Sequence, residues 1–457
     1  MPLPLIAIIA VFCIGYAFII LEHNVNVDKA APAVLTGVLC WAIYILAAPG
    51  LIDIASLPQA FVDAQTGKST EEIIKTWVGQ HQVLEGFAET ASILFFLLGA
   101  MTIVEMVDAY GGFSIITDRI RSTSMVTLLW IIGTVTFFLS AALDNLTTTI
   151  VMISLIRKLI DEHSDRLFFS GIIVIAANAG GAWSPIGDVT TTMLWIGGQI
   201  TTMKIITAIF VPSTVCLVIP LLFLTFRLRG RQIRAPQQNA AETEAKYAVP
   251  KSHRDLIFIV GMGGLLFVPV LKTLTHLPPF MGMLFSLGVL WVLSEVVHKD
   301  REQAMQSGMH ILTVLRRIDT PSVLFFLGIL TAVSALQATG LLGQAANFLD
   351  HTVGNLDLIV FLIGLLSAVI DNVPLVAAAM GMYDLGVHPT DSALWEFLAF
   401  AAGTGGSCLI IGSAAGVAAM GMERINFFWY MRNISGLALL GYVAGCAVIV
   451  LEKQFMF

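Results

Sequence analysis

The sequence predicts an all-α membrane protein in which about ten transmembrane helices and two re-entrant helical hairpins form two inverted-topology repeats. Three observations lead to this fold class. Hydrophobic residues make up 57% of the 457 residues and charged residues only 12%, whereas soluble domains carry about 25% charged residues. Apolar runs of about 20 residues, long enough to cross a bilayer, recur along the chain. Three motifs of the first half also return, in the same order, in the second half.

Most of the apolar runs are expected to be helices that cross the membrane. They are residues 3–21, 31–50, 87–108, 167–198, 204–226, 256–274, 280–297, 321–338, 392–422 and 430–451. The first lacks a basic stretch before it and a small-residue cleavage motif after it, which favours a retained span over a signal peptide. The segment 52–82 is polar, and residues 69–80 within it predict an amphipathic helix.

Two further apolar stretches, 124–160 and 356–382, are interrupted by the pairs Asp144-Asn145 and Asp371-Asn372. Open backbone at mid-membrane depth must be buried in protein or line a cavity. We therefore expect each stretch to be a helical hairpin that enters and leaves on one side of the membrane.

Two of the expected spans are themselves interrupted, at 178–182 and at 402–407. Each interruption contains a glycine pair, Gly180-Gly181 or Gly405-Gly406. The glycines predict discontinuous helices whose free carbonyls and half-helix ends face the hairpin tips.

The placement of basic residues predicts the orientation, because loops on the cytoplasmic side carry an excess of Lys and Arg. The polar loop 227–254 is expected to be a cytoplasmic linker between a first repeat, 1–226, and a second repeat, 255–457. Both termini are then external. This orientation leaves five of the 24 basic residues outside: Lys68, Lys75, Lys204, Lys272 and Lys453.

The two halves correspond motif by motif. The sequence after Ser92 resembles that after Ser322, 230 positions later. The Asp144-Asn145 motif returns after 227 positions, and the motif that begins at Gly180-Gly181 returns after 225. In the predicted orientation the first hairpin enters from the cytoplasm and the second from outside, an inverted arrangement that supports alternating access in secondary transporters.

Carboxylates at mid-membrane depth are costly and mark functional sites by default. Asp144 and Asp371 lie at the hairpin breaks, each beside an asparagine, where unwound carbonyls and side-chain oxygens converge. Such a cluster of oxygens suits a small, hard cation such as Na⁺. Because Na⁺ and protons compete for the same carboxylates, loading one releases the other, which is sufficient for antiport.

The candidate cation- and proton-binding residues share an oxygen-bearing side chain near a helix break. They are Asp144, Asn145, Thr147, Thr148, Ser184, Asp188, Thr190, Asp371, Asn372, Thr404, Ser407 and Ser413, with Glu105 in the third span. Alternatives remain open for several of them. The Asp-Asn pairs and Asp188 are also suited to capping helix starts, and Glu105 can extend its carboxylate to the membrane surface instead.

Several other classes of function lack their sequence signals. No aromatic-interleaved basic stripe indicates nucleic-acid binding. Neither H-E-x-x-H nor G-x-S-x-G is found, so no enzyme activity and no cofactor are expected. The five cysteines lie in or beside apolar runs without metal-ligand spacing, as small core residues do. A channel is also less consistent with titratable hairpin tips than alternating access is.

The motifs resemble those of NhaD-type Na⁺/H⁺ antiporters, which belong to the ion transporter superfamily with arsenite exporters and divalent-anion/sodium symporters. Segments 93–105, 142–149, 177–190 and 370–377 carry the resemblance, which extends over the chain from about residue 85 onward.

This resemblance implies exchange of cytoplasmic Na⁺, and Li⁺, for external protons in a bacterial inner membrane, with a role in sodium and alkaline-pH homeostasis. It implies a homodimer with an elevator-type transport domain, 86–200 and 321–422, and a scaffold made by the other spans. Aspartate at the hairpin tips, where the anion symporters have serine, disfavours an anionic substrate, although the second tip lacks the threonine of the first. An exporter of arsenite or another small anion is the alternative.

Overall fold

The computed structural model describes residues 1–25, 27–117, 120, 122, 124–233, 250–297 and 309–456, which are almost entirely helical. The β-type pairing among them is an isolated bridge between Ser124 and Gln232. Nine helices in these ranges are long and apolar enough to cross a membrane. The predicted all-α membrane fold is confirmed, while most of the predicted linker, 234–249, lies outside the described residues.

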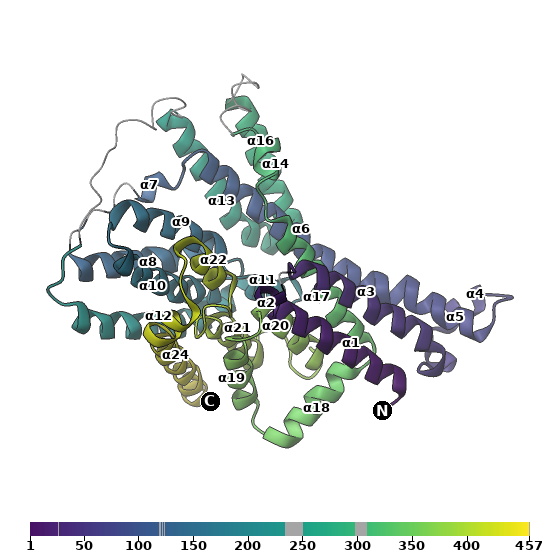
Figure 1. The fold of residues 1–457 in the computed structure, drawn as a ribbon. Helices are drawn as coiled ribbons and strands as arrows, with labels where there is room; N and C mark the ends of the chain where they lie inside the picture. Colours follow the sequence, from purple (N-terminus) through teal and green to yellow (C-terminus); the bar gives the residue numbers. More distant parts are fainter. Residues whose placement is uncertain are drawn as a thin grey trace. The chain divides into compact units, whose positions relative to one another are not determined.

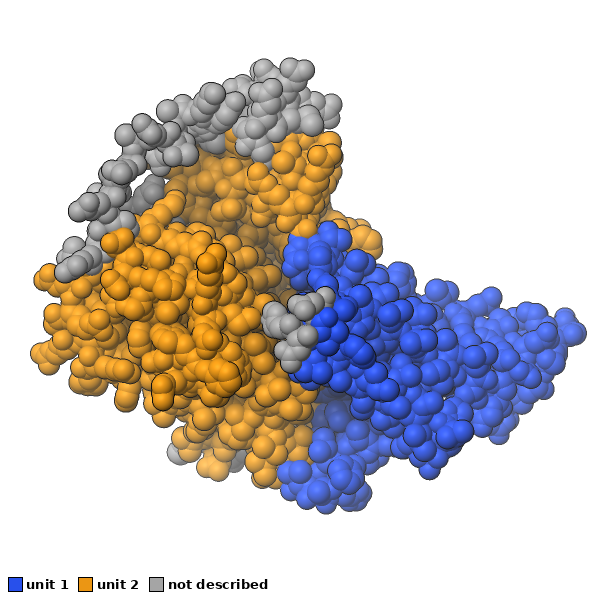
Figure 2. All heavy atoms as spheres, viewed as in Figure 1, with its two compact units in different colours: residues 1–94, 319–354, 377–387 blue, residues 95–318, 355–376, 388–457 orange. Residues whose placement is uncertain are grey.

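The helices form two compact units, which Figure 2 shows in different colours. The first comprises residues 1–94, 319–354 and 377–387, and the second comprises 95–318, 355–376 and 388–457. Two helices contribute residues to both units: α6 (Val83–Ala109) and α20 (Asn372–Met382).

In the first unit, α3 packs against both α1 and α17. The helices of this unit are α1 (Leu3–Ile20), α2 (Glu22–Val25), α3 (Ala30–Ala47), η1 (Ala48–Gly50), η2 (Ile54–Ser56), α4 (Gln59–Ala64), α5 (Thr70–Trp77), η3 (Val78–Gln82), α17 (Thr320–Ala338) and α18 (Leu341–Val353). Glycine allows the close crossing of α3 and α17, because a Cβ on Gly328 would lie 2.4 Å from the backbone carbon of Ala33. The indole Nε1 of Trp41 donates to the Thr331 carbonyl at 3.0 Å across the same crossing.

The amphipathic helix predicted over 69–80 is present as α5. Ser69 caps it: the Ser69 hydroxyl accepts from the Glu72 amide, and the Glu72 carboxylate accepts from the Ser69 amide. This capping box satisfies two amides that the first turn would otherwise leave unpaired. Ile73 and Ile74 are its buried residues, as the apolar periodicity predicts.

The second unit holds the two motifs that carry the Asp-Asn pairs. Its helices are α7 (Ser114–Thr117), α8 (Met125–Ala142), α9 (Asn145–Leu159), α10 (His163–Ala182), α11 (Val189–Ile196), α12 (Thr202–Leu228), α13 (Lys251–Thr275), α14 (Pro279–Val297), α16 (Ile311–Leu315), α19 (Leu356–Leu366), α21 (Ala393–Gly405), α22 (Ala414–Glu423), α23 (Phe427–Asn433) and α24 (Ser435–Met456).

Helix α10 is largely enclosed by other helices of this unit. It packs against α8, α9, α12, α21 and α22 (Figure 1), and every residue from Phe169 to Ala182 is buried. A helix that is apolar all round is expected to be surrounded by protein, and the polar Asn178 near its end is therefore placed deep inside the unit.

The helix breaks were predicted a few residues too early. Helix α10 continues through Gly180-Gly181 to Ala182, and the chain is non-helical from there to Asp188. Proline has no amide hydrogen and disfavours helical backbone before it, so Pro185 accounts for this break better than the glycines do. In the second repeat, α21 ends at Gly405 and the next helix begins after Ser413, although no proline lies between them, so proline strengthens the first break but is not required for this one.

Other boundaries also differ from the prediction. The segment between the predicted span 321–338 and the predicted hairpin 356–382 contains α18, which was missed because it buries only Leu341, Leu342 and Ala346 and has no long apolar run. The predicted span 430–451 is divided into α23 and α24. Helix α10 begins at His163, so its first turn is more polar than the apolar run suggested.

Candidate cation-binding site

The two predicted hairpins and the two predicted discontinuous helices meet in the second unit. Helices α8 and α9 are separated by Leu143-Asp144, and α19 and α20 by residues 367–371. Helix α9 packs against α10 and α22, and α21 packs against α10 and α11. These contacts place the hairpin tip of each repeat next to the ends of the broken helices.

Glycines allow these close approaches, and they do so equivalently in both repeats. A Cβ on Gly180 would lie 2.2 Å from the Phe137 carbonyl oxygen of α8, and a Cβ on Gly405 would lie 1.9 Å from the Gly364 carbonyl oxygen of α19. No side chain fits at such distances. The predicted helix-break glycines therefore act as contact points between helices, and the helices end nearby.

Matching hydrogen bonds fix the same contact. The Ser140 hydroxyl of the first hairpin donates to the Ala177 carbonyl at 2.6 Å. The Ser367 hydroxyl of the second hairpin donates to the Ala402 carbonyl at 2.8 Å. The offsets of 227 and 225 positions are those of the sequence repeat, so the repeated motifs build the same local structure twice.

Asp188 is at the centre of a buried polar network. Its side chain caps α11: Oδ1 accepts from the Thr190 amide at 2.9 Å and from the Thr190 hydroxyl at 2.8 Å. The Asn372 amide reaches the same oxygen at 3.4 Å, and the Asn145 amide donates to Oδ2 at 2.5 Å. Both carboxylate oxygens are thus engaged, by residues from both repeats.

Asn178 extends the network to the second repeat. Its Oδ1 accepts from the Asn145 amide at 2.9 Å, and its Nδ2 donates to the hydroxyls of Ser407 and Ser413 at 2.8 and 2.9 Å. Ser413 also caps α22, accepting from the Gly416 amide at 3.2 Å. All of these side chains are buried.

The two hairpin aspartates lie close to this network. Asp144 caps α9: its carboxylate accepts from the Thr147 amide at 2.7 Å and from the Thr147 hydroxyl at 2.8 Å. Asp371 accepts from the Val373 amide at 3.2 Å. Both carboxylates are near enough to Asp188 to interact with it electrostatically, so three acidic groups lie in one region of the unit.

Four other predicted residues have different surroundings. The Thr148 hydroxyl is buried and has no hydrogen-bond partner among the described residues. Ser184 accepts from the Ile186 amide at 3.4 Å, and the Thr404 hydroxyl donates to the Phe400 carbonyl of its own helix at 2.6 Å. Glu105 lies 3.5 Å from the Arg317 guanidinium, and within the described residues it forms no hydrogen bond with Asp188.

Asn178 is the residue that sequence reasoning missed. The signal was present: it is a lone amide in an otherwise apolar helix end, Gly171–Ala182. Its counterpart after 225 positions is Gly403. Because the repeat comparison favoured matched residues, a residue that lacks a polar partner in the other half was not singled out.

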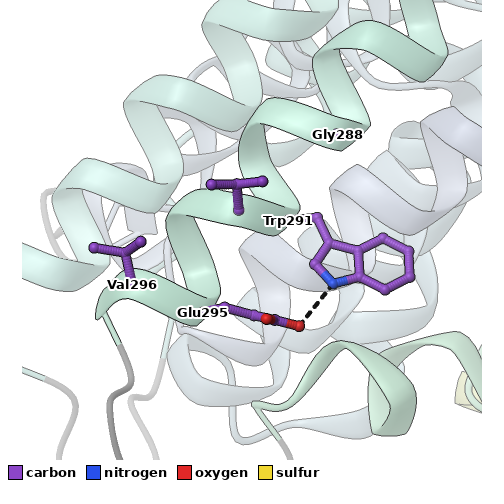
Figure 3. A pocket seen from close by; sticks show the side chains of 5 residues that line it. Gly288, Trp291, Glu295 and Val296 are labelled. Atoms are coloured by element: carbon purple, nitrogen blue, oxygen red, sulfur yellow. Dashed lines mark hydrogen bonds between the residues drawn. The ribbon is translucent and has the colours of Figure 1, made fainter.

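Figure 3 shows another hollow of the second unit, of about 510 Å³. Its lining comes from α14 alone, through Gly288, Trp291, Val292, Glu295 and Val296. The Trp291 indole donates to the Glu295 carboxylate at 2.9 Å. Because one helix supplies every lining residue, polar groups from several elements do not converge here as they do at Asp188.

Comparison with known proteins shows which family the chain belongs to. The sequence profile described as "CitMHS: Citrate transporter" matches residues 16–405. The chain belongs to this CitMHS citrate transporter family. As a family member it is a multi-pass membrane transporter and not an enzyme.

Relatives of this CitMHS protein match it over almost its whole length. Sodium/proton antiporter 1 of Arabidopsis thaliana is 49% identical over 454 residues, 99% of this chain and 73% of that protein. The Na⁺/H⁺ antiporter NhaD of Vibrio cholerae is 29% identical over 477 residues, 99% of this chain and 92% of that protein. The resemblance to NhaD-type antiporters is confirmed.

The fold of the CitMHS chain is also found in a solved structure. The YdaH transporter of Alcanivorax borkumensis matches with a TM-score of 0.57 and 12% identity, covering 93% of this chain and 99% of that one. This match supports the fold assignment.

Proposed function

We propose that this transporter exchanges cytoplasmic Na⁺, and Li⁺, for external protons across a bacterial inner membrane. The observation that carries the proposal is the buried Asp188 carboxylate, which is held by side chains of both repeats and has Asp144 and Asp371 nearby. The names of the relatives, sodium/proton antiporters from a plant and from bacteria, support the same exchange.

The chemistry follows from the donors that now surround Asp188. Asparagine amide and threonine hydroxyl hydrogens point at its oxygens. Rotation of the Asn145 or Asn372 amide would present a carbonyl oxygen instead, and hard cations prefer oxygen ligands. The buried Thr148 hydroxyl, which has no hydrogen-bond partner within the described part of the chain, is a further oxygen in the same motif. Protonation of the carboxylates removes the charge that attracts Na⁺, so the two ions exclude each other.

The proposed exchange also requires that the site opens to each side of the membrane in turn. Hairpins and broken helices in inverted repeats place a site at mid-membrane depth between two similar halves. We assign residues 86–200 and 321–422 to a transport domain that moves as an elevator against a scaffold in a homodimer. The matched Ser140–Ala177 and Ser367–Ala402 contacts support a rigid pairing of each hairpin with its broken helix.

The test is dissipation of a pH gradient in everted membrane vesicles after addition of Na⁺, Li⁺ or K⁺ over a pH series. Wild-type protein should collapse the gradient with Na⁺ and Li⁺. Asp144→Asn and Asp371→Asn should be silent while remaining monodisperse after purification. Wild-type vesicles that ignore every added cation would overturn the exchange and direct attention to anions.

A second candidate is export of arsenite or another small anion. The family description as a citrate transporter favours it. Three carboxylates in one region would repel an anion unless a cation bound first, which argues for the cation exchange. Uptake of labelled arsenite or citrate into the same vesicles, without any response to Na⁺, would favour this alternative.

A further inference from the structure

A second cavity of the same unit lies where the C-terminal end of α11 meets α12 and α13. It has a volume of about 680 Å³. Its lining includes Trp195, Thr201, Met203, Lys272 and Leu274. None of its lining residues is acidic, and the site described above does not use it.

Lys272 supplies the positive charge of this cavity. Its ammonium donates to the Trp195 carbonyl at 2.8 Å and lies 4.4 Å from the centroid of the Trp195 indole. In the described chain no carboxylate forms an ion pair with it. Cations within membrane helices are normally paired, so a half-buried ammonium with only a carbonyl and a ring for partners indicates room for an anion.

Most other polar groups near Lys272 already form hydrogen bonds within the protein, so few are left to bind an anion. The Thr201 hydroxyl donates to Asp391 at 2.8 Å, and the Thr390 hydroxyl donates to the Gly198 carbonyl at 2.7 Å. Asp391 is itself directed at Thr201 and is not part of the lining. His276 also lines the cavity, is exposed, and adds a polar ring to the lining.

The rim of the cavity is apolar and open. Met203 and Leu274 are each 72% exposed, and they belong to α12 and α13, two helices suited to crossing a membrane. A cation at the end of membrane helices, beside exposed apolar side chains, matches a molecule with an anionic head and an acyl tail. Basic pockets between transmembrane helices bind lipid head groups in this way.

We propose that this cavity binds an anionic phospholipid, with its phosphate at Lys272 and His276 and its acyl chains over Met203 and Leu274. The bound lipid contacts the C-terminal end of α11, the half-helix that Asp188 caps at its other end. This inference does not depend on which ion is transported.

The experiment measures thermal unfolding of the purified full chain in detergent during titration with phosphatidylglycerol, with phosphatidylcholine as the zwitterionic comparison. Phosphatidylglycerol should stabilise the wild type, and the apparent affinity should fall about fivefold in Lys272→Gln. Lys68→Gln is the matched control, because it removes the same charge from an exposed loop. Thr273→Trp keeps Lys272 but fills the cavity, so it should also lose the effect.

Three outcomes would overturn the proposal. Equal stabilisation by phosphatidylcholine would mean that the protein does not select a lipid with an anionic head group. Undiminished affinity for phosphatidylglycerol in Lys272→Gln or Thr273→Trp would place the lipid elsewhere. If soluble glycerol phosphate stabilises the wild type but not Lys272→Gln, the ligand is a soluble phosphate compound and not a lipid.

Discussion

At the scale of the residue, Asp188 caps a helix and also belongs to the polar network that we propose binds the cation. Its Oδ1 caps α11 through Thr190, while Oδ2 accepts from Asn145. Capping needs only an oxygen acceptor, which asparagine supplies as well as aspartate does. Cation binding needs the negative charge. The two roles are therefore separable by substitution.

We predict that Asp188→Asn keeps the fold but weakens exchange. Loss of a charge-assisted contact of about 1.5–3 kcal/mol should raise the half-saturating Na⁺ concentration about 10- to 150-fold. Asp188→Ala removes the cap as well and should lower stability by a further ~0.5–2 kcal/mol. Vesicle transport and thermal unfolding measure the two effects, and wild-type exchange by Asp188→Asn would leave Asp188 with the capping role alone.

At the scale of the element, the contacts between hairpins and broken helices depend on glycine. Gly405 touches the backbone of α19, and Gly180 touches that of α8, at distances that leave no space for a Cβ. Other glycines of this unit, such as Gly421 in α22, have no atom within 4 Å of that position. The two kinds of glycine should respond oppositely to alanine.

We predict that Gly405→Ala lowers the free energy of unfolding by about 1–3 kcal/mol, because α21 must move away from α19. Gly421→Ala should raise it by about 0.5–1 kcal/mol, since alanine favours a helix interior. Thermal unfolding in detergent compares them. A similar loss in both variants would show that close approach is not the limiting factor.

At the scale of the whole molecule, an ionic cluster joins the two repeats. Glu423, at the end of α22, is buried, and its carboxylate lies 2.5 Å from Arg157 Nε and 3.2 Å from Arg166 Nε. His163 Nδ1 lies 3.5 Å away. The acid belongs to the second repeat and its partners to the first, so this contact holds α22 against the helix pair α9 and α10.

We predict that Glu423→Gln lowers stability by about 1.5–3 kcal/mol, because the two arginines lose a charged hydrogen-bond acceptor. Glu71→Gln is the control: its Lys75 partner lies one turn away on an exposed helix, and such pairs contribute at most about 1 kcal/mol. If both variants unfold at the same temperature, the cluster does not hold the repeats together.

The sequence by itself determined the membrane class, most spans, both hairpin breaks and the acidic residues at their tips. These follow from local rules: apolar length, the cost of buried charge, and motifs that occur twice. Boundaries were wrong where local signals were weak, as at α18, or where a glycine pair indicated a break that lies a few residues later.

Only the tertiary structure decided which oxygens meet. Asn145 and Ser413 are far from Asn178 in the chain, and nothing in their spacing shows that Asn145 donates to both Asp188 and Asn178 while Asn178 donates to Ser413. The same holds for Glu105, whose partner Arg317 comes from a distant segment. Hydrophobic patterning fixes which face of a helix is buried, but the partner across that face is set by how the helices pack.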